Sequence, residues 1–112
     1  MAAKKKNSRN KGHSFERKIA KDMQSIGYKG ARRQLEYHTD DANGVDIQQT
    51  PPFKIQCKAM KNQPSIHKVM DEVEAEREEI PVVIYKVDRK GTYAAFKIDD
   101  ALRLMKIFKE NL

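Results

Sequence analysis

Three residues suited to metal and phosphate chemistry, Asp46, Gln56 and Lys58, occur within one short span of the chain. Apolar residues flank Asp46, and apolar residues alternate with the two other polar side chains over 53–59, which is the two-residue period of a strand. The Thr50-Pro51-Pro52 segment between them is a turn signal, so the two segments are predicted to pair as antiparallel neighbours. The acid, the amide and the amine then share one face of a hairpin whose other face is apolar.

Such a face has the groups that phosphodiester hydrolysis needs. A hard cation such as Mg²⁺ prefers oxygen ligands, which Asp46, the Gln56 amide and the main-chain carbonyl of Cys57 can provide. Lys58 can orient or help to deprotonate water and stabilise developing negative charge. The alternative is that an ordinary surface strand carries a turn-proximal acid and a solvated lysine by chance. Taken together, the set favours a metal-dependent phosphodiesterase site.

Periodicity and breakers predict the elements that would position this face. They are a helix from Ser14 to about Gly27, a strand over 31–37, the hairpin strands over 44–47 and 53–59, a helix over 65–79 closed by Pro81, strands over 82–87 and 92–98, and a final helix capped by Asp99 or Asp100. The strand over 82–87 is nearly all apolar, which predicts a central position. The fold class is therefore α/β, a mixed central sheet flanked by helices in the order αβββαββα.

The first predicted helix has an apolar stripe of Phe15, Ile19, Met23 and Ile26. Glu16 lies at the edge of this stripe, from which a carboxylate can reach towards the sheet. Its alternative role is that of an ordinary acid stabilised by the helix N-terminus.

The final helix also has an apolar stripe. Its members are Ala101, Leu104, Met105, Phe108 and Leu112. Leu102 and Ile107 fall beside the stripe, where they either widen the buried face or mark a subunit contact.

Composition predicts one domain with a nucleic-acid partner. The 112 residues have a net charge of +7, and most of that excess lies in the first 12 residues. Residues 1–11 are predicted to be a flexible basic arm, and residues 12–112 a single nuclease-like domain. A basic arm indicates a polyanion such as DNA, although a solubilising tail has the same composition.

Cysteine content and hydropathy indicate the cellular compartment in which the protein occurs. Cys57 is the single cysteine, which predicts no internal disulfide and a reducing environment. The three histidines lack the spacing of zinc ligands. No apolar run is long enough to span a bilayer, so we expect no membrane and a cytoplasmic protein, in the host cytoplasm if a phage encodes it.

The residues around the hairpin resemble the PD-(D/E)xK nuclease superfamily. The opening segment 11–17, with Lys11-Gly12 before Glu16-Arg17, is similar to the archaeal-type Holliday junction resolvases. The resemblance implies a restriction-endonuclease-like fold and a homodimer that cuts four-way DNA junctions with Mg²⁺ or Mn²⁺. The implied catalytic residues are Glu16, Asp46, Gln56 and Lys58. The implied metal ligands are Asp46, Gln56, the Cys57 carbonyl and Glu16, and the implied DNA contacts are Lys11, Arg17, Arg32 and Arg33.

Gln56 departs from the resolvase pattern, which usually has a second acid at this place. An amide oxygen still binds a hard cation but with less charge, and Mrr-like restriction enzymes have glutamine here. Asp40 or Asp41 could compensate from the adjoining loop. Two other functions stay open: a less structure-selective repair or restriction nuclease, and a DNA-binding module that no longer cuts.

Overall fold

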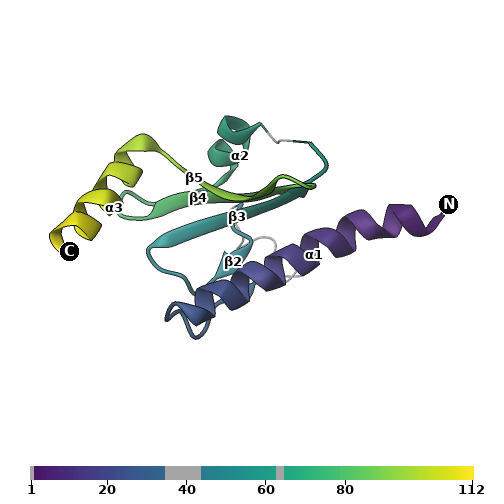
Figure 1. Cartoon of the computed structure of the whole chain (residues 1–112), viewed down its shortest axis with the longest axis horizontal. Coiled ribbons are helices and arrows are strands. Elements are labelled where there is room, and N and C mark those ends of the chain that lie inside the picture. Colours follow the sequence, from purple (N-terminus) through teal and green to yellow (C-terminus); the bar gives the residue numbers. More distant parts are fainter. Residues whose placement is uncertain (1, 35–43, 63–64) are drawn as a thin grey trace.

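The fold is an α/β arrangement with one mixed five-stranded sheet. The computed structural model describes residues 2–34, 44–62 and 65–112, with side chains from residue 12 onward. In chain order its elements are α1 (Ala2–Ser25), β1 (Arg32–Arg33), β2 (Ile47–Gln48), β3 (Phe53–Met60), α2 (Ile66–Glu72), β4 (Ile80–Val87), β5 (Gly91–Phe96) and α3 (Ile98–Glu110). The sheet order is β1-β2-β3-β4-β5 (Figure 1). The predicted class and mixed sheet are confirmed.

The predicted hairpin is formed by β2 and β3, which pair antiparallel with Ile47 opposite Ile55. The prediction of its first strand over 44–47 is wrong in its bounds, because β2 comprises Ile47 and Gln48 and Asp46 lies just before it. Its turn is held by Thr50 and Phe53. The Phe53 N–H donates to the Thr50 carbonyl at 2.7 Å, and the Thr50 hydroxyl donates to the Phe53 carbonyl at 3.0 Å. On its other edge β3 runs parallel to β4, which in turn pairs antiparallel with β5. The apolar strand β4 is thus central, as predicted.

Helices α1 and α2 cover opposite faces of the sheet. Ile55 and Cys57 of β3 belong to one buried cluster with Phe15 and Ile19 of α1. Val83 of β4 is buried in a second cluster with residues of α2. Since side chains alternate along a strand, the polar residues of β3 point away from α1 and towards the α2 face. The predicted division of the hairpin into an apolar and a polar face is confirmed.

Helix α1 is longer than predicted and ends earlier. It begins at Ala2 rather than near Ser14, so the backbone of the basic segment is helical where a flexible arm was predicted. It ends at Ser25, and Gly27 follows with a φ of +116°, a conformation that favours glycine. Ile26 therefore lies past the helix and is 69% exposed, so its place in the buried stripe was wrong.

Helix α2 is shorter than predicted, because it ends at Glu72 instead of Glu79. The chain turns at Val73, which is buried with an extended backbone. The segment after it must return to the sheet, where the Ile80 N–H donates to the Pro52 carbonyl at 2.9 Å. Pro81 does not close a helix. It lies near the start of β4, before the pairing with β5 begins at Val82.

Helix α3 lies at one end of the molecule in Figure 1. Its N-cap is Lys97, and Asp99 and Asp100 lie in its first turn instead of capping it. Leu104 packs against the main core, but no residue of α3 is buried. Phe108 is 69% exposed, so the predicted burial of the stripe is wrong for most of its length.

Strand β1 comprises only Arg32 and Arg33. The rest of the strand predicted over 31–37 lies largely outside the described residues, as do Asp40 and Asp41.

Candidate active site

Asp46 is fixed at the seam between β2 and β3. Its N–H donates to the Ile55 carbonyl at 2.7 Å, and its carbonyl accepts from the Gln34 N–H at 2.6 Å. Its carboxylate oxygen Oδ2 accepts from the Cys57 N–H at 2.7 Å. The Asp46 carboxylate therefore accepts the Cys57 N–H, which would otherwise pair with a main-chain carbonyl of the neighbouring strand. This fixes the carboxylate beside the Cys57 peptide, and the Cys57 carbonyl points to the same edge of β3.

Gln56 is buried on the α2 face, with 6% of its surface exposed. Its amide Nε2 donates to Oε2 of Glu72 at 3.0 Å, which fixes which end of the amide is nitrogen. The amide oxygen Oε1 is buried and has no hydrogen-bond partner in the described part of the chain. Buried polar atoms without a partner are rare and costly, so this oxygen is a candidate ligand for a cation.

Glu72 is the residue that sequence reasoning missed. It is an exposed residue at the last position of α2, and its carboxylate accepts a hydrogen bond from Gln56. The two residues are 16 positions apart, so no local pattern in the sequence pairs them. Glu72 thus places a carboxylate beside Gln56, the position at which the resolvase pattern usually has its second acid.

The pKa of Asp46 is set by burial and by neighbouring groups, of which some raise it and some lower it. Burial raises the pKa of Asp46 above its ordinary value of 3.8, and the Glu72 carboxylate adds a smaller increase. The hydrogen bond from the Cys57 N–H and the charge of Lys58 lower the pKa again. Lys58 and Glu72 are therefore both within electrostatic reach of the Asp46 carboxylate. A divalent cation at this point would relieve the cost of keeping Asp46 ionised.

Gly44 positions the segment that carries Asp46. Its φ is +75°, and a Cβ added there would overlap the main-chain carbonyl of Glu72. Backbone packs directly on backbone at this point, which only glycine permits. The end of α2 and the start of the Asp46 segment are thereby brought together.

Glu16 lies beside Arg33 and near Cys57. Its carboxylate is 3.8 Å from the Arg33 guanidinium Nε. Burial chiefly raises the pKa of the Cys57 thiol, and Asp46 and Glu16 raise it further, so both acids lie near Cys57. Within the described ranges no group of three or more His, Cys, Asp or Glu side chains could hold a metal ion.

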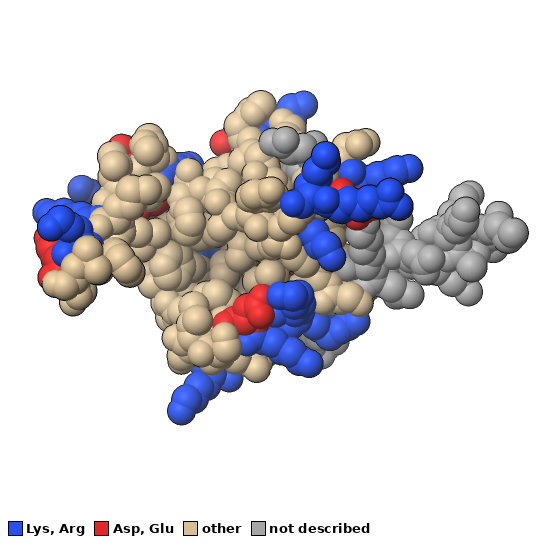
Figure 2. All heavy atoms as spheres, in the orientation of Figure 1, with Lys and Arg blue, Asp and Glu red and all other residues tan. Residues whose placement is uncertain are grey.

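The residues predicted to contact DNA differ in their surroundings. Arg17 and Arg32 are exposed. The Arg33 side chain is only 15% exposed, and its guanidinium Nε lies 3.8 Å from the Glu16 carboxylate. The side chain of Lys11 lies outside the described residues. Figure 2 shows that Lys and Arg side chains gather along α1 and at one end of the sheet.

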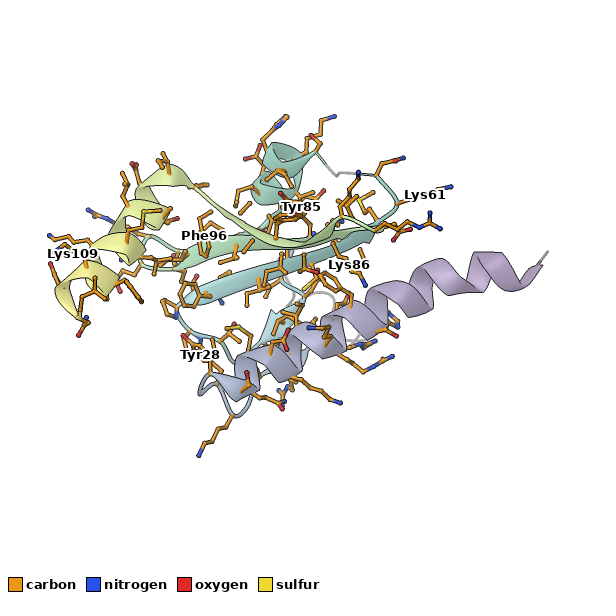
Figure 3. All side chains as sticks on the ribbon, in the orientation of Figure 1. Tyr28, Lys61, Tyr85, Lys86, Phe96 and Lys109 are labelled. Atoms are coloured by element: carbon orange, nitrogen blue, oxygen red, sulfur yellow. The ribbon has the colours of Figure 1, made fainter. Side chains whose placement is uncertain are left out.

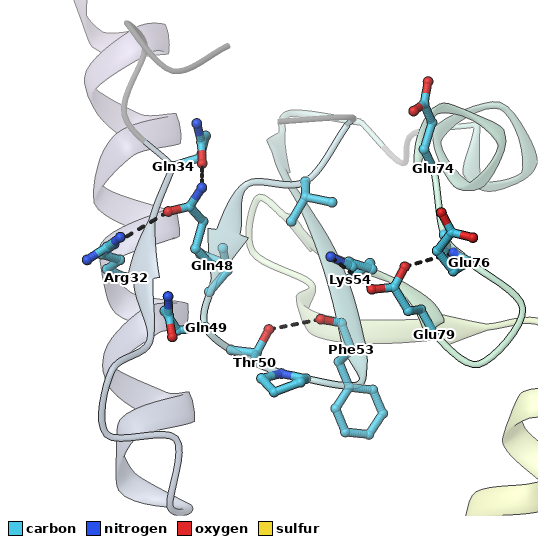
Figure 4. Close-up of a pocket in the computed structure, with 14 residues that line it drawn as sticks. Arg32, Gln34, Gln48, Gln49, Thr50, Phe53, Lys54, Glu74, Glu76 and Glu79 are labelled. Atoms are coloured by element: carbon cyan, nitrogen blue, oxygen red, sulfur yellow. Dashed lines mark hydrogen bonds and ion pairs between the residues drawn. The ribbon is translucent and has the colours of Figure 1, made fainter. Parts of the chain in front are cut away.

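A cavity of about 800 Å³ flanks the candidate site at the N-terminal end of β3 (Figure 4). Arg32 donates to Gln48 at 3.4 Å, and Gln48 donates to Gln34, so one wall carries linked amides. On the opposite wall Lys54 pairs with Glu79 at 3.0 Å. The cavity reaches the residues on both sides of Asp46 but is not lined by Gln56 or Lys58. The cavity therefore lies beside Asp46, Gln56 and Lys58 and is not lined by them.

The oxygen donors around Gln56 and Asp46 are of the chemical type that a hard divalent cation binds. They combine two carboxylates, Asp46 and Glu72, with the orphaned amide oxygen of Gln56 and the adjacent carbonyl of Cys57. These are the oxygen ligands that Mg²⁺ and Mn²⁺ prefer. Lys58, on the same face of β3, stands beside them as a positive charge.

Across the described ranges, no helix is both long enough and apolar enough to cross a bilayer. No family model, curated protein or solved structure matches this chain.

Proposed function

We propose that the protein is a metal-dependent DNA endonuclease that hydrolyses phosphodiester bonds and acts on four-way junctions. One observation supports this most strongly. The buried Gln56 amide donates to Glu72, and its oxygen has no hydrogen-bond partner among the described residues. The charges of Lys58 and Glu72 both act on the nearby Asp46 carboxylate. The resemblance of these residues to the PD-(D/E)xK pattern gives the reaction class. A restriction-endonuclease-like fold is part of this proposal.

In the proposed site, Asp46, Gln56, Glu72 and the Cys57 carbonyl would hold Mg²⁺ or Mn²⁺. The ion would supply positive charge at the phosphate and would lower the pKa of an attacking water. The chain contributes position and charge. The hydrogen bond from the Cys57 N–H fixes one oxygen of Asp46, and Glu72 fixes the rotation of the Gln56 amide. Lys58 stabilises the negative charge that develops on the phosphate oxygens.

The proposal changes the expected role of Glu16. In the resolvase-like assignment Glu16 assists the metal, whereas here its carboxylate lies near Arg33. We assign Glu16 to positioning Arg33 against α1 and assign the second acid of the site to Glu72.

The exposed arginines supply affinity for DNA. Arg17 projects from α1, with its guanidinium 3.4 Å from the Ser14 hydroxyl, and Arg32 is exposed on the edge strand β1. Phosphate contacts of this type supply affinity that falls with salt. We propose both residues as phosphate contacts and leave Arg33 out of that set.

A homodimer would cover the apolar side of α3. Four of its large apolar side chains lie within one arc of the helix and are each at least 55% exposed: Ile98, Leu102, Met105 and Phe108. An exposed apolar helix face of this kind is typical of an association surface. Two copies would also provide two active sites, which symmetric cutting of a junction requires.

Substituting Phe108→Glu is expected to convert a dimer into a monomer, because a charge would be buried at the centre of the apolar face. Light scattering coupled to gel filtration measures the change, over a range of concentrations. Lys106→Glu is the matched control, since Lys106 is an exposed residue of the same helix. A wild-type protein that is monomeric throughout, or a dimer that both variants leave intact, would contradict this interface.

Cleavage tests the proposed function. Labelled four-way junction, linear duplex and single strand are incubated with the protein in Mg²⁺, in Mn²⁺ and in chelator. We expect paired nicks in the junction that require metal, and little cutting of the linear substrates. Equal cutting of all three substrates would favour the less selective nuclease. Binding without cleavage in either metal would leave a non-cleaving DNA-binding module.

A further inference from the structure

Two tyrosines next to the candidate site form a stacked pair. Tyr85 of β4 and Tyr93 of β5 lie directly opposite each other, with ring centroids 5.6 Å apart and planes inclined by 29°. Tyr85 is half-buried, but Tyr93 is 50% exposed. A half-exposed aromatic ring that is supported by a neighbouring ring is a surface on which another planar group can stack.

A basic hollow of about 440 Å³ adjoins these rings. Its lining consists of Lys61, Asn62, Tyr85, Val87, Asp88, Lys90 and Tyr93. The two lysines outnumber the single acid, so the hollow is net positive. The Tyr93 hydroxyl donates to the Lys90 carbonyl at 3.3 Å, which holds the ring beside the β4–β5 turn. Figure 3 labels Lys61 and Tyr85 at this end of the sheet, and Figure 2 shows Lys and Arg side chains gathered there.

The pair is in line with Lys58 across the sheet. Lys58 is opposite Tyr85 in the parallel β3–β4 register, and Tyr85 is opposite Tyr93. Side chains at paired positions share a face, so all three point towards the same side. With strands about 4.8 Å apart, Tyr93 lies roughly 10 Å across the sheet from Lys58. A nucleic-acid strand covers that distance in a few nucleotides.

We infer that Tyr93, supported by Tyr85 and flanked by Lys61 and Lys90, is a stacking platform for an unpaired base of the DNA strand whose phosphate lies at Lys58. Aromatic rings beside lysines bind single-stranded nucleic acid by stacking on bases while the cations neutralise phosphates. The platform therefore favours DNA that exposes unpaired bases near the cut. This inference rests on the proposed function only for the placement of the phosphate at Lys58.

The test is equilibrium binding in chelator, so that no strand is cut. The probes are a fluorescein-labelled 15-nucleotide oligothymidine and a fully paired duplex of the same length, measured by fluorescence anisotropy. Tyr93→Ala is expected to weaken binding of the single strand by about 5- to 100-fold, the effect of losing one base–aromatic stack, and to change duplex binding much less. Tyr93→Phe is expected to bind like the wild type, because the ring remains.

Two further variants separate stacking from general charge and from folding. Tyr93→Leu keeps apolar bulk without an aromatic face, so it is expected to lose binding as Tyr93→Ala does. Lys90→Ala is expected to reduce the salt dependence of single-strand binding, whereas Lys109→Ala on the distant helix α3 is expected to leave it unchanged. Thermal melting of each variant shows whether the fold is intact.

The outcomes distinguish the platform from the proposed nuclease. Equal single-strand affinity for folded Tyr93→Ala and Tyr93→Phe would overturn the platform, even if the wild type cuts junctions. Loss of affinity in Tyr93→Ala but not in Tyr93→Phe would support the platform, even if the protein cuts nothing. Binding of an acidic peptide as tight as that of the oligothymidine would also overturn it, since charge alone would then explain the hollow.

Discussion

Asp46→Asn is expected to abolish cleavage while leaving the protein at least as stable as the wild type at neutral pH. The asparagine keeps an oxygen that can accept from the Cys57 N–H but removes the charge that a cation and its water need. Loss of a charged group at the reacting centre is expected to cost about 100-fold or more in rate. A junction-nicking assay in Mg²⁺ measures this loss.

The stability half of this prediction follows from the sign of the pKa shift. Burial raises the pKa of Asp46 in the folded state above its value of 3.8 in the free side chain. Between those two values the folded protein binds more protons than the unfolded chain, so stability falls as the pH rises through that window. Asparagine does not titrate. The stability advantage of Asp46→Asn should therefore be absent below about pH 4 and should grow as the pH rises above it.

Urea unfolding of both proteins from pH 3 to pH 8 measures this difference. A variant that is clearly less stable than the wild type at neutral pH would show that ionised Asp46 stabilises the fold, contrary to this account. A variant that retains cleavage would remove Asp46 from the site.

Gly44→Ala is expected to destabilise the protein and to disrupt the site together. The new methyl group would overlap the Glu72 carbonyl, and the φ of +75° is itself unfavourable for alanine. The strain costs about 1–2 kcal/mol, and relieving the overlap by moving main chain costs a similar amount or more. We expect a loss of about 3 kcal/mol in the free energy of unfolding, with weaker metal binding because Glu72 is displaced.

Gly27→Ala is the matched control. Gly27 also has a positive φ, +116°, but an added Cβ there meets nothing within 4 Å. The Gly27→Ala variant therefore measures the cost of backbone strain without steric overlap. Its loss in the free energy of unfolding should be smaller than that of Gly44→Ala. Similar losses in both variants, with cleavage intact in Gly44→Ala, would show that the contact between Gly44 and Glu72 does not organise the site.

Short-range patterns in the sequence predicted the centre of the fold well. The alternation over 53–59 and the Thr50-Pro51-Pro52 turn correctly predicted which side chains of β3 face the core and that β3 pairs with β2. This worked because the period of a strand and the chemistry of a turn are local properties. Asp46, Gln56 and Lys58 were placed on one face for the same reason.

Long-range packing accounts for what the sequence did not predict. Helix α2 ends at Glu72 because the chain must return to start β4 beside β3, and no local signal in the acidic stretch marks that point. The contact between Glu72 and Gln56 was therefore not predicted. The apolar stripe of α3 predicted a helix correctly, but the pattern of a helix does not state whether its apolar face meets its own core or another surface.

The most direct test of the central claim is a titration of the protein with Mn²⁺, in which electron paramagnetic resonance counts the free ion. The account predicts a saturable site in the wild type that is lost in Asp46→Asn and weakened in Glu72→Gln, with Glu74→Gln unchanged as the exposed acidic control. Mg²⁺ should compete for the same site. No saturable binding in the wild type, or equal binding in all four proteins, would contradict a metal centre built from Asp46, Gln56 and Glu72.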